Sequence, residues 1–158
     1  MSDFQIQFRV RYAETDAMGI VHHAVYPVWF EMGRTEFLRH AGMSYRAMED
    51  LGLQSPVIEL RLRYLRPARY DDCITVETRI TRYTGVRLSI AYRVTANGEL
   101  LCTGETEHAF LYSGRLAALQ KACPEIHEML DRCAQADKQA KQTQEMTQYI
   151  GGVGETYE

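Results

Sequence analysis

The sequence predicts one α+β domain in which an antiparallel sheet wraps around a long helix. Three patterns support this fold class. Apolar and polar residues alternate along five segments, as in strands that bury one face. One segment between residues 26 and 41 instead repeats its apolar residues at helical spacing. Short turns join the later strands, which indicates that neighbouring strands are antiparallel. One apolar helix laid across such a sheet buries the apolar faces of both.

The first strand and the long helix occupy the first 42 residues. Alternation from Phe4 to Val10 predicts the strand. Pro27 suits the first turn of the helix, where a missing N–H does no harm, and Gly42 is a stop signal. A glycine in the apolar face of this helix would allow close approach to the sheet. That face is formed by Tyr26, Trp29, Phe30, Gly33, Phe37 and Ala41.

Four further strands follow Pro56, at about residues 58–64, 74–80, 86–94 and 100–111. Because their turns are short, we expect them to pair as a continuous meander. Asn97-Gly98 predicts a type I′ hairpin, which requires positive φ at both central residues. A short helix is predicted over residues 44–51, with Ser44 as its N-cap.

The C-terminal part predicts an amphipathic helix that begins at Pro124. From about Gln142 onward, polar residues and glycines dominate, which is typical of a frayed tail. We therefore expect a single domain over residues 1–135, with residues 136–158 as the helix end and a flexible tail.

Composition excludes several classes of protein. The formal net charge of −3 favours neither nucleic acid nor an anionic membrane surface, and no apolar run reaches the roughly 20 residues of a membrane span. The first residues lack the basic and apolar regions of a signal peptide. The four cysteines form no C-x-x-C pair, which favours reduced structural thiols. We expect a cytoplasmic protein.

The richest chemistry lies between Tyr12 and Arg34, where ionisable residues gather before a helix. A helix N-terminus offers free N–H donors and a positive dipole end, which suit a carbonyl oxygen that becomes an oxyanion. A carboxylate just before it can act on the same carbonyl. A metal site is not expected, because adjacent histidines rarely point at one centre and no H-E-x-x-H spacing exists. The ionisable residues near the helix start include Glu14, Asp16, His22 and His23.

This segment, with the element order, resembles the 4-hydroxybenzoyl-CoA thioesterase family, including its acyl-CoA thioesterase branch found near bacterial Tol-Pal systems. The resemblance covers residues 4–111. A second matching segment, at residues 63–72, is similar to the family's second strand and its Pro-containing turn. Position 22 departs from the pattern, since it is usually aromatic and here is His22. The matching residues of the first segment are Tyr12, Thr15, Asp16, Gly19, Val21, His23, Tyr26, Phe30, Glu31 and Arg34.

The resemblance implies a hotdog fold and makes Asp16 the catalytic carboxylate, either nucleophile or base for water. The alternative for Asp16 is an Asx turn before the helix. His23 can contribute its backbone N–H to the oxyanion, or its imidazole can orient water or Asp16. Tyr12 is expected to donate a hydrogen bond to the substrate or to Asp16, or else to pack at the strand end.

Five residues are expected to bind substrate. His22 and Tyr26 would shape the acyl pocket, although Tyr26 also fits the packed helix face. Glu31 would orient groups at a subunit interface or pair with Arg34 at i+3. Arg63 and Arg66 would hold the phosphates of coenzyme A, since guanidinium groups bind phosphate well. The other arginines between residues 61 and 93 fit a solvated sheet face.

We therefore expect an acyl-CoA thioesterase that forms a homodimer or homotetramer and needs no metal or cofactor beyond the coenzyme A of its substrate. Two alternatives remain open. A hotdog dehydratase or hydratase acting on a 3-hydroxyacyl thioester would use His23 with Glu31 but would leave Asp16 without a role. A non-catalytic acyl-CoA binding module would bind the ester without turnover.

Overall fold

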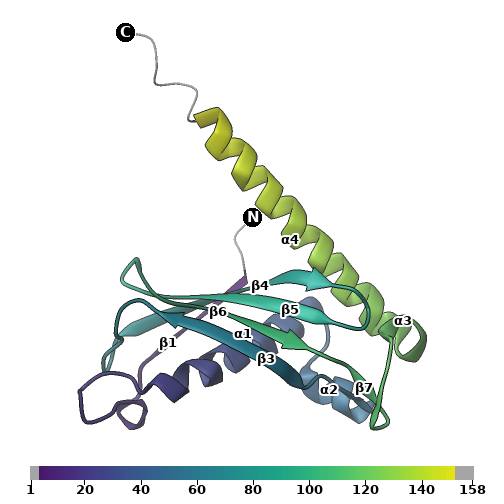
Figure 1. Ribbon diagram of the computed structural model, residues 1–158, viewed down its shortest axis with the longest axis horizontal. Helices are drawn as coiled ribbons and strands as arrows, with labels where there is room; N and C mark the ends of the chain where they lie inside the picture. The colour runs from purple at the N-terminus through teal and green to yellow at the C-terminus, as the bar shows by residue number, and fades with distance from the viewer. Residues whose placement is uncertain (1–3, 152–158) are drawn as a thin grey trace.

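A five-stranded antiparallel sheet curves around helix α1 (Tyr26–Ala41), as Figure 1 shows. The computed structural model describes residues 4–151. The predicted α+β class is confirmed. The strands of this sheet are β1 (Phe4–Arg9), β3 (Val57–Tyr64), β4 (Cys73–Tyr83), β5 (Leu88–Ala96) and β6 (Glu99–His108).

The strand order is β1-β4-β5-β6-β3, so only β4, β5 and β6 form a meander. The prediction of one continuous meander was wrong for β3, which pairs with β6 at the far edge. The reason is the connection to β4: residues 65–72 form a long crossing segment instead of a tight turn. The N–H of Val21 donates to the carbonyl of Ala68 in this segment at 2.8 Å, so the crossing lies against the loop before α1.

Helix α1 packs its aromatic face into the concave side of the sheet. The ring of Phe30 stacks on Tyr92 of β5, with centroids 4.4 Å apart. Glycines permit this closeness: a Cβ on Gly104 would lie 2.3 Å from the Phe30 ring, and one on Gly33 would lie 2.6 Å from Thr78 Oγ1. The predicted helix bounds and the role of Gly33 are confirmed.

The smaller elements also follow their predicted signals. Helix α2 (Tyr45–Asp50) is capped by Ser44, whose hydroxyl accepts the Ala47 N–H at 3.2 Å. The hairpin at Asn97-Gly98 has φ of 52° and 77°, as a type I′ turn requires. Two single-turn 3-10 helices, η1 (Tyr12–Glu14) and η2 (His23–Val25), lie before α1. A small second sheet contains β2 (Leu53–Gln54), β7 (Leu111–Tyr112) and β8 (Arg115–Leu116).

The C-terminal helix is longer than predicted. After the short helix α3 (Leu119–Ala122), helix α4 runs over Pro124–Gly151 and continues through the segment expected to fray from Gln142. It packs against β4, where Asp137 Oδ2 accepts the Ile80 N–H at 2.7 Å, and then projects beyond the sheet (Figure 1). The rest of the predicted tail, residues 152–158, lies outside the described residues. Within residues 4–151, no helix is both long and apolar enough to cross a bilayer.

Candidate active site

A buried carboxylate fixes the loop between β1 and α1. Glu14 accepts hydrogen bonds from the backbone N–H of Arg11 at 2.8 Å and from Trp29 Nε1 of α1 at 3.2 Å. Burial raises the pKa of Glu14, but the hydrogen bonds from Arg11 and Trp29 outweigh it, so that the net pKa lies below the usual range. The Glu14 carbonyl also accepts the N–H of His22 at 2.9 Å. One residue therefore ties both ends of the loop to the helix.

Asp16 lies in the tight turn of this loop. Its Oδ1 accepts the N–H of Met18 at 2.9 Å, and its carbonyl accepts the N–H of Gly19, whose φ is 75°. The Asx turn foreseen as the alternative for Asp16 is thus present. It uses only one carboxylate oxygen. Among residues 4–151, no donor is bonded to Oδ2, which stays available for chemistry.

The two histidines open the helical segment. The ring of His22 caps η2, with Nδ1 accepting the N–H of Ala24 at 3.1 Å, and it stacks on the His23 ring at 4.2 Å. The His23 carbonyl accepts the Tyr64 hydroxyl at 2.6 Å. The N–H groups of His22 and Ala24 are bonded, whereas that of His23 has no acceptor among the described residues. This free donor is at the position where the sequence placed an oxyanion donor.

Asp16 and His23 line the same cavity, which we call the loop cavity and which has a volume of about 330 Å³. Tyr26 lies in its wall, and burial raises the pKa of Tyr26 to about 12, so its phenol stays protonated. The loop cavity is lined further by Met18, Ile20, Val21, Tyr64, Leu65, Arg66 and Pro67.

Four of the predicted site residues lie elsewhere. His22, expected to shape the acyl pocket, caps η2 and is not part of the cavity wall. The side chain of Tyr12 is 78% exposed and packs edge-on against Tyr70. Arg63 stands opposite Thr103 on β6 and is not part of the cavity wall. Glu31 lines a different cavity, one to two turns further along α1. Arg66 does line the loop cavity, where it also pairs with Glu99 at 3.0 Å.

The second cavity, of about 250 Å³, lies between α1 and the start of β3, and we call it the polar chamber. Leu38, Val57, Leu88 and Ile90 form its apolar walls. The predicted ion pair between Glu31 and Arg34 is present, with a distance of 3.5 Å. The polar residues of the chamber are Glu31, Arg34, Thr35, Tyr45, Ser55 and His108.

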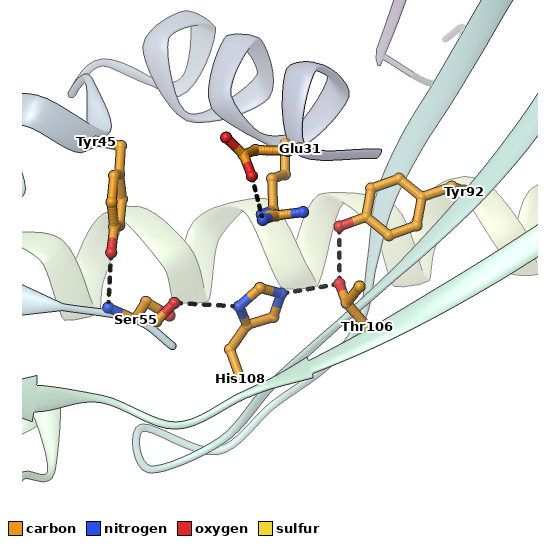
Figure 2. A network of polar contacts seen from close by, with 7 residues as sticks. Glu31, Tyr45, Ser55, Tyr92, Thr106 and His108 are labelled. Atoms are coloured by element: carbon orange, nitrogen blue, oxygen red, sulfur yellow. Dashed lines mark hydrogen bonds and ion pairs between the residues drawn. The ribbon is translucent and has the colours of Figure 1, made fainter. Parts of the chain in front are cut away.

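A hydrogen-bonded chain runs along one wall of the polar chamber (Figure 2). His108, 2% exposed, lies between the Ser55 carbonyl, 3.4 Å from Nδ1, and the Thr106 hydroxyl, 2.8 Å from Nε2. Tyr92 contacts the same hydroxyl at 2.8 Å. Burial, together with the charge of Arg34, lowers the pKa of His108 to about 4. The imidazole is therefore neutral at neutral pH.

Sequence reasoning assigned no role to His108 and considered Glu14 only as a metal ligand. A signal for His108 existed, because it continues the inward-facing alternation of β6. An imidazole at such a position must find partners inside the protein. Across the described residues, no group of three or more His, Cys, Asp and Glu side chains is arranged to hold a metal ion.

Comparisons with known proteins show which family the chain belongs to. A model of the thioesterase-like superfamily matches residues 10–140. YneP of Bacillus subtilis (strain 168), provisionally named an acyl-CoA thioesterase, is 36% identical over 129 residues, which are 80% of this chain and 94% of YneP. The acyl-CoA thioester hydrolase YbgC of Escherichia coli O6:H1 is 36% identical over 104 residues, 66% of this chain and 77% of YbgC.

A solved structure extends the match to nearly the whole chain. The DHNA-CoA thioesterase of Staphylococcus aureus is 28% identical, with a TM-score of 0.78, and the alignment covers 97% of this chain and 95% of that one. The curved sheet around α1 is thus the architecture of hotdog thioesterases, as the resemblance implied. The chain therefore belongs to the thioesterase-like superfamily.

Proposed function

We propose that this protein is a thioester hydrolase that cleaves acyl-CoA to the free acid and coenzyme A. The observation that carries the proposal is the pairing, in one cavity, of a carboxylate oxygen on Asp16 and an unbonded N–H on His23. Thioester hydrolysis needs both groups: one to act on the carbonyl carbon or on water, and one to stabilise the oxyanion. The names of the relatives support the same class of substrate.

Asp16 acts through Oδ2, since Oδ1 is held by the loop. As nucleophile, it forms a mixed anhydride while the C–S bond breaks and coenzyme A leaves as thiolate, and water then hydrolyses the anhydride. As base, it takes a proton from water while the hydroxide adds to the carbonyl. The tetrahedral intermediate then collapses: the C–S bond breaks, and coenzyme A leaves as thiolate and takes up a proton. In either route the His23 N–H receives the oxyanion, a contribution of about 100- to 1,000-fold in rate.

The surroundings of His23 hold this donor in place. The Tyr64 hydroxyl donates to the His23 carbonyl, so the end of β3 fixes the peptide that follows the free N–H. Arg66 at the cavity wall supplies a cation for a phosphate of coenzyme A. The proposed reaction uses no cofactor beyond the coenzyme A that the substrate brings.

We further propose that the working form is a homodimer or a pair of dimers, built on the edge strand β3. One side of β3 pairs with β6, and no other strand of the described residues pairs with the opposite side. An open edge with exposed apolar side chains is a template for pairing with another strand. Its exposed apolar residues are Val57, Ile58, Leu60 and Tyr64, with Leu65 just beyond. The free cysteines fit a cytoplasmic location.

The test is thiol release from a panel of short, long and aromatic acyl-CoA esters, with 4-hydroxybenzoyl-CoA among them. Asp16→Asn should abolish turnover while the fold persists. Asp72→Asn is the matched control, because Asp72 is also a half-buried loop carboxylate, bonded to the N–H of Arg69 at 2.8 Å. No thiol release from any ester, or equal activity of Asp16→Asn and wild type, would refute the proposal. A fully active monomer would refute the dimer.

A further inference from the structure

The polar chamber has no role in the chemistry proposed for Asp16 and His23. Arg34 lies eight residues beyond Tyr26 on α1, about 12 Å further along the helix axis. The chamber is nevertheless a built site, with a nearly buried cation, a buried polar wall and apolar residues on the remaining sides. Its donors and acceptors indicate what it would bind.

Arg34 is the charged group inside the chamber. Its side chain is only 18% exposed, whereas that of Glu31 is 68% exposed, so the guanidinium lies inside and the carboxylate lies at the rim. Among residues 4–151, Glu31 is the only carboxylate within 4 Å of Arg34, and their 3.5 Å separation exceeds the roughly 2.8 Å of a good charge-assisted hydrogen bond. A guanidinium so far removed from water still needs acceptors.

The hydrogen-bonded wall around His108 offers Arg34 an acceptor at the Tyr92 hydroxyl. The Ser55 carbonyl can only accept, so His108 donates from Nδ1 and must accept at Nε2. The Thr106 hydroxyl therefore donates to Nε2, and the Tyr92 hydroxyl donates to Thr106. The lone pairs of the Tyr92 oxygen are left facing the guanidinium. Burial raises the pKa of Tyr92, and the charge and hydrogen bond of Arg34 act against that rise.

Tyr45 adds a second donor on the opposite side. Its oxygen accepts the backbone N–H of Ser55 at 3.0 Å, which leaves its own O–H proton unused among the described residues. Figure 2 shows this hydroxyl above Ser55, on the side of His108 away from Thr106. The chamber thus presents a guanidinium and a phenol O–H as donors, and its neutral histidine is already satisfied. The positive charge of Arg34 would repel a cation.

We propose that the polar chamber binds the carboxylate of a small organic acid, with Arg34 as its ion-pair partner and Tyr45 as a second donor. The apolar walls, which include Leu38 and Ile90, would hold a short aliphatic or aromatic body, for which a volume of about 250 Å³ is sufficient. Glu31 pairs only loosely with Arg34, at 3.5 Å, and moves aside when the ligand binds.

The carboxylate can come from two sources. One is a free acid. The other is the far end of the acyl group of a thioester, a possibility that depends on the proposed function. In an antiparallel β3 pair, the start of one strand lies beside the end of the other. The chamber of one protomer, at Val57, would then lie beside the loop cavity of its partner, at Tyr64.

The deciding experiment is a calorimetric titration with benzoate and with its uncharged analogue benzamide. Benzoate should bind at least about 10-fold more tightly than benzamide, and Arg34→Gln should remove that difference. Glu31→Gln should tighten benzoate binding about 2- to 5-fold, because it removes the competing carboxylate. Arg39→Gln is the matched control, since Arg39 pairs with Glu36 on the same helix at the same i,i+3 spacing, and it should bind benzoate like wild type.

Equal binding of benzoate and benzamide, or unchanged binding in Arg34→Gln, would overturn the proposal. Weaker benzoate binding in Glu31→Gln would also overturn it. Because Arg34→Gln should weaken benzoate binding and Glu31→Gln should tighten it, a general loss of fold cannot explain both results. Thermal melting of each variant would detect such a loss directly.

A second measurement separates the two sources. Glutaryl-CoA carries a terminal carboxylate, and 5-methylhexanoyl-CoA carries an isopropyl group in its place. A higher kcat/KM for glutaryl-CoA that Arg34→Gln abolishes would assign the carboxylate to the acyl group. Equal rates alongside Arg34-dependent benzoate binding would assign the chamber to a free acid. If neither these esters nor the wider panel are hydrolysed, the proposed function fails, and the benzoate titration still decides the chamber.

Discussion

Replacing Glu14 by alanine should destabilise the protein by about 3 to 4 kcal/mol. The estimate follows from the two donors that Glu14 satisfies in the interior, the Arg11 N–H and Trp29 Nε1. A buried donor left without its partner costs roughly 1–3 kcal/mol. The ion pair with the Arg11 guanidinium adds little, because that side chain is 73% exposed.

Glu14→Gln separates charge from shape. It keeps one acceptor oxygen but turns an amide N–H₂ toward one of the two donors, so we expect a loss of about 2 kcal/mol. The pKa of Glu14 is lowered in the folded protein, so its contribution to stability is complete above the ordinary value of 4.5 and is lost as the pH falls through the folded pKa. The difference between wild type and Glu14→Gln should therefore shrink below about pH 4.5.

The assay is urea denaturation of wild type and both variants at pH 7 and at several values down to pH 3.5. The backbone carbonyl of Glu14 accepts the N–H of His22, and neither substitution removes this carbonyl. Both variants should therefore keep that hydrogen bond within the loop. A loss below about 1 kcal/mol in Glu14→Ala at pH 7, or a pH-independent difference for Glu14→Gln, would refute the reasoning about this carboxylate.

Three further substitutions test the packing around α1 and α4. Gly104→Ala should cost at least about 2 kcal/mol in urea denaturation, because the new methyl would meet the Phe30 ring; a neutral result would contradict the close approach. Thr78→Val should instead stabilise by about 1 kcal/mol, since the buried Thr78 hydroxyl has no hydrogen-bond partner in the described structure, and a loss of stability would show that it has one. Asp137→Ala should cost roughly 1–3 kcal/mol and speed amide exchange at Ile80, whose N–H loses its acceptor; unchanged exchange would contradict the docking of α4.

Much of the fold could be predicted because its signals are local. Pro27 and Gly42 mark the two ends of α1, and the alternation of apolar residues finds each long strand. The Asn97-Gly98 turn adopts the positive φ angles that its residue types favour. In each case the backbone conformation depends on residues a few positions apart, so the sequence alone contains the information.

The errors concern choices that local patterns do not fix. The pairing of β3 with β6 depends on the path of residues 65–72 across the sheet, which turn length alone does not determine. The tail from Gln142 was judged by its polarity, yet its first residues include glutamine, glutamate and methionine, which favour a helix, and Glu145 pairs with Lys141 one turn before it. Helical propensity was the better guide there than polarity.

The candidate site likewise has one part that the local sequence predicts and one part that depends on how distant elements pack. Asp16 and His23 belong to one short motif, and the structure places them in one cavity. His108 and Arg34 are 74 positions apart and meet only because β6 and α1 pack on each other. Their shared environment, and with it the polar chamber, could not be inferred from spacing along the chain.

The position of β3 at the far edge also affects how the chain folds as it is synthesised. Its neighbour β6 ends at His108, 44 residues after the last residue of β3, Tyr64. At roughly 5–20 residues per second, the ribosome needs about 2 to 9 seconds to make that stretch. During this time the apolar side chains of β3 have no strand beside them. Slower synthesis of residues 65–108 would lengthen this exposure, so rare codons in that stretch should lower the soluble yield.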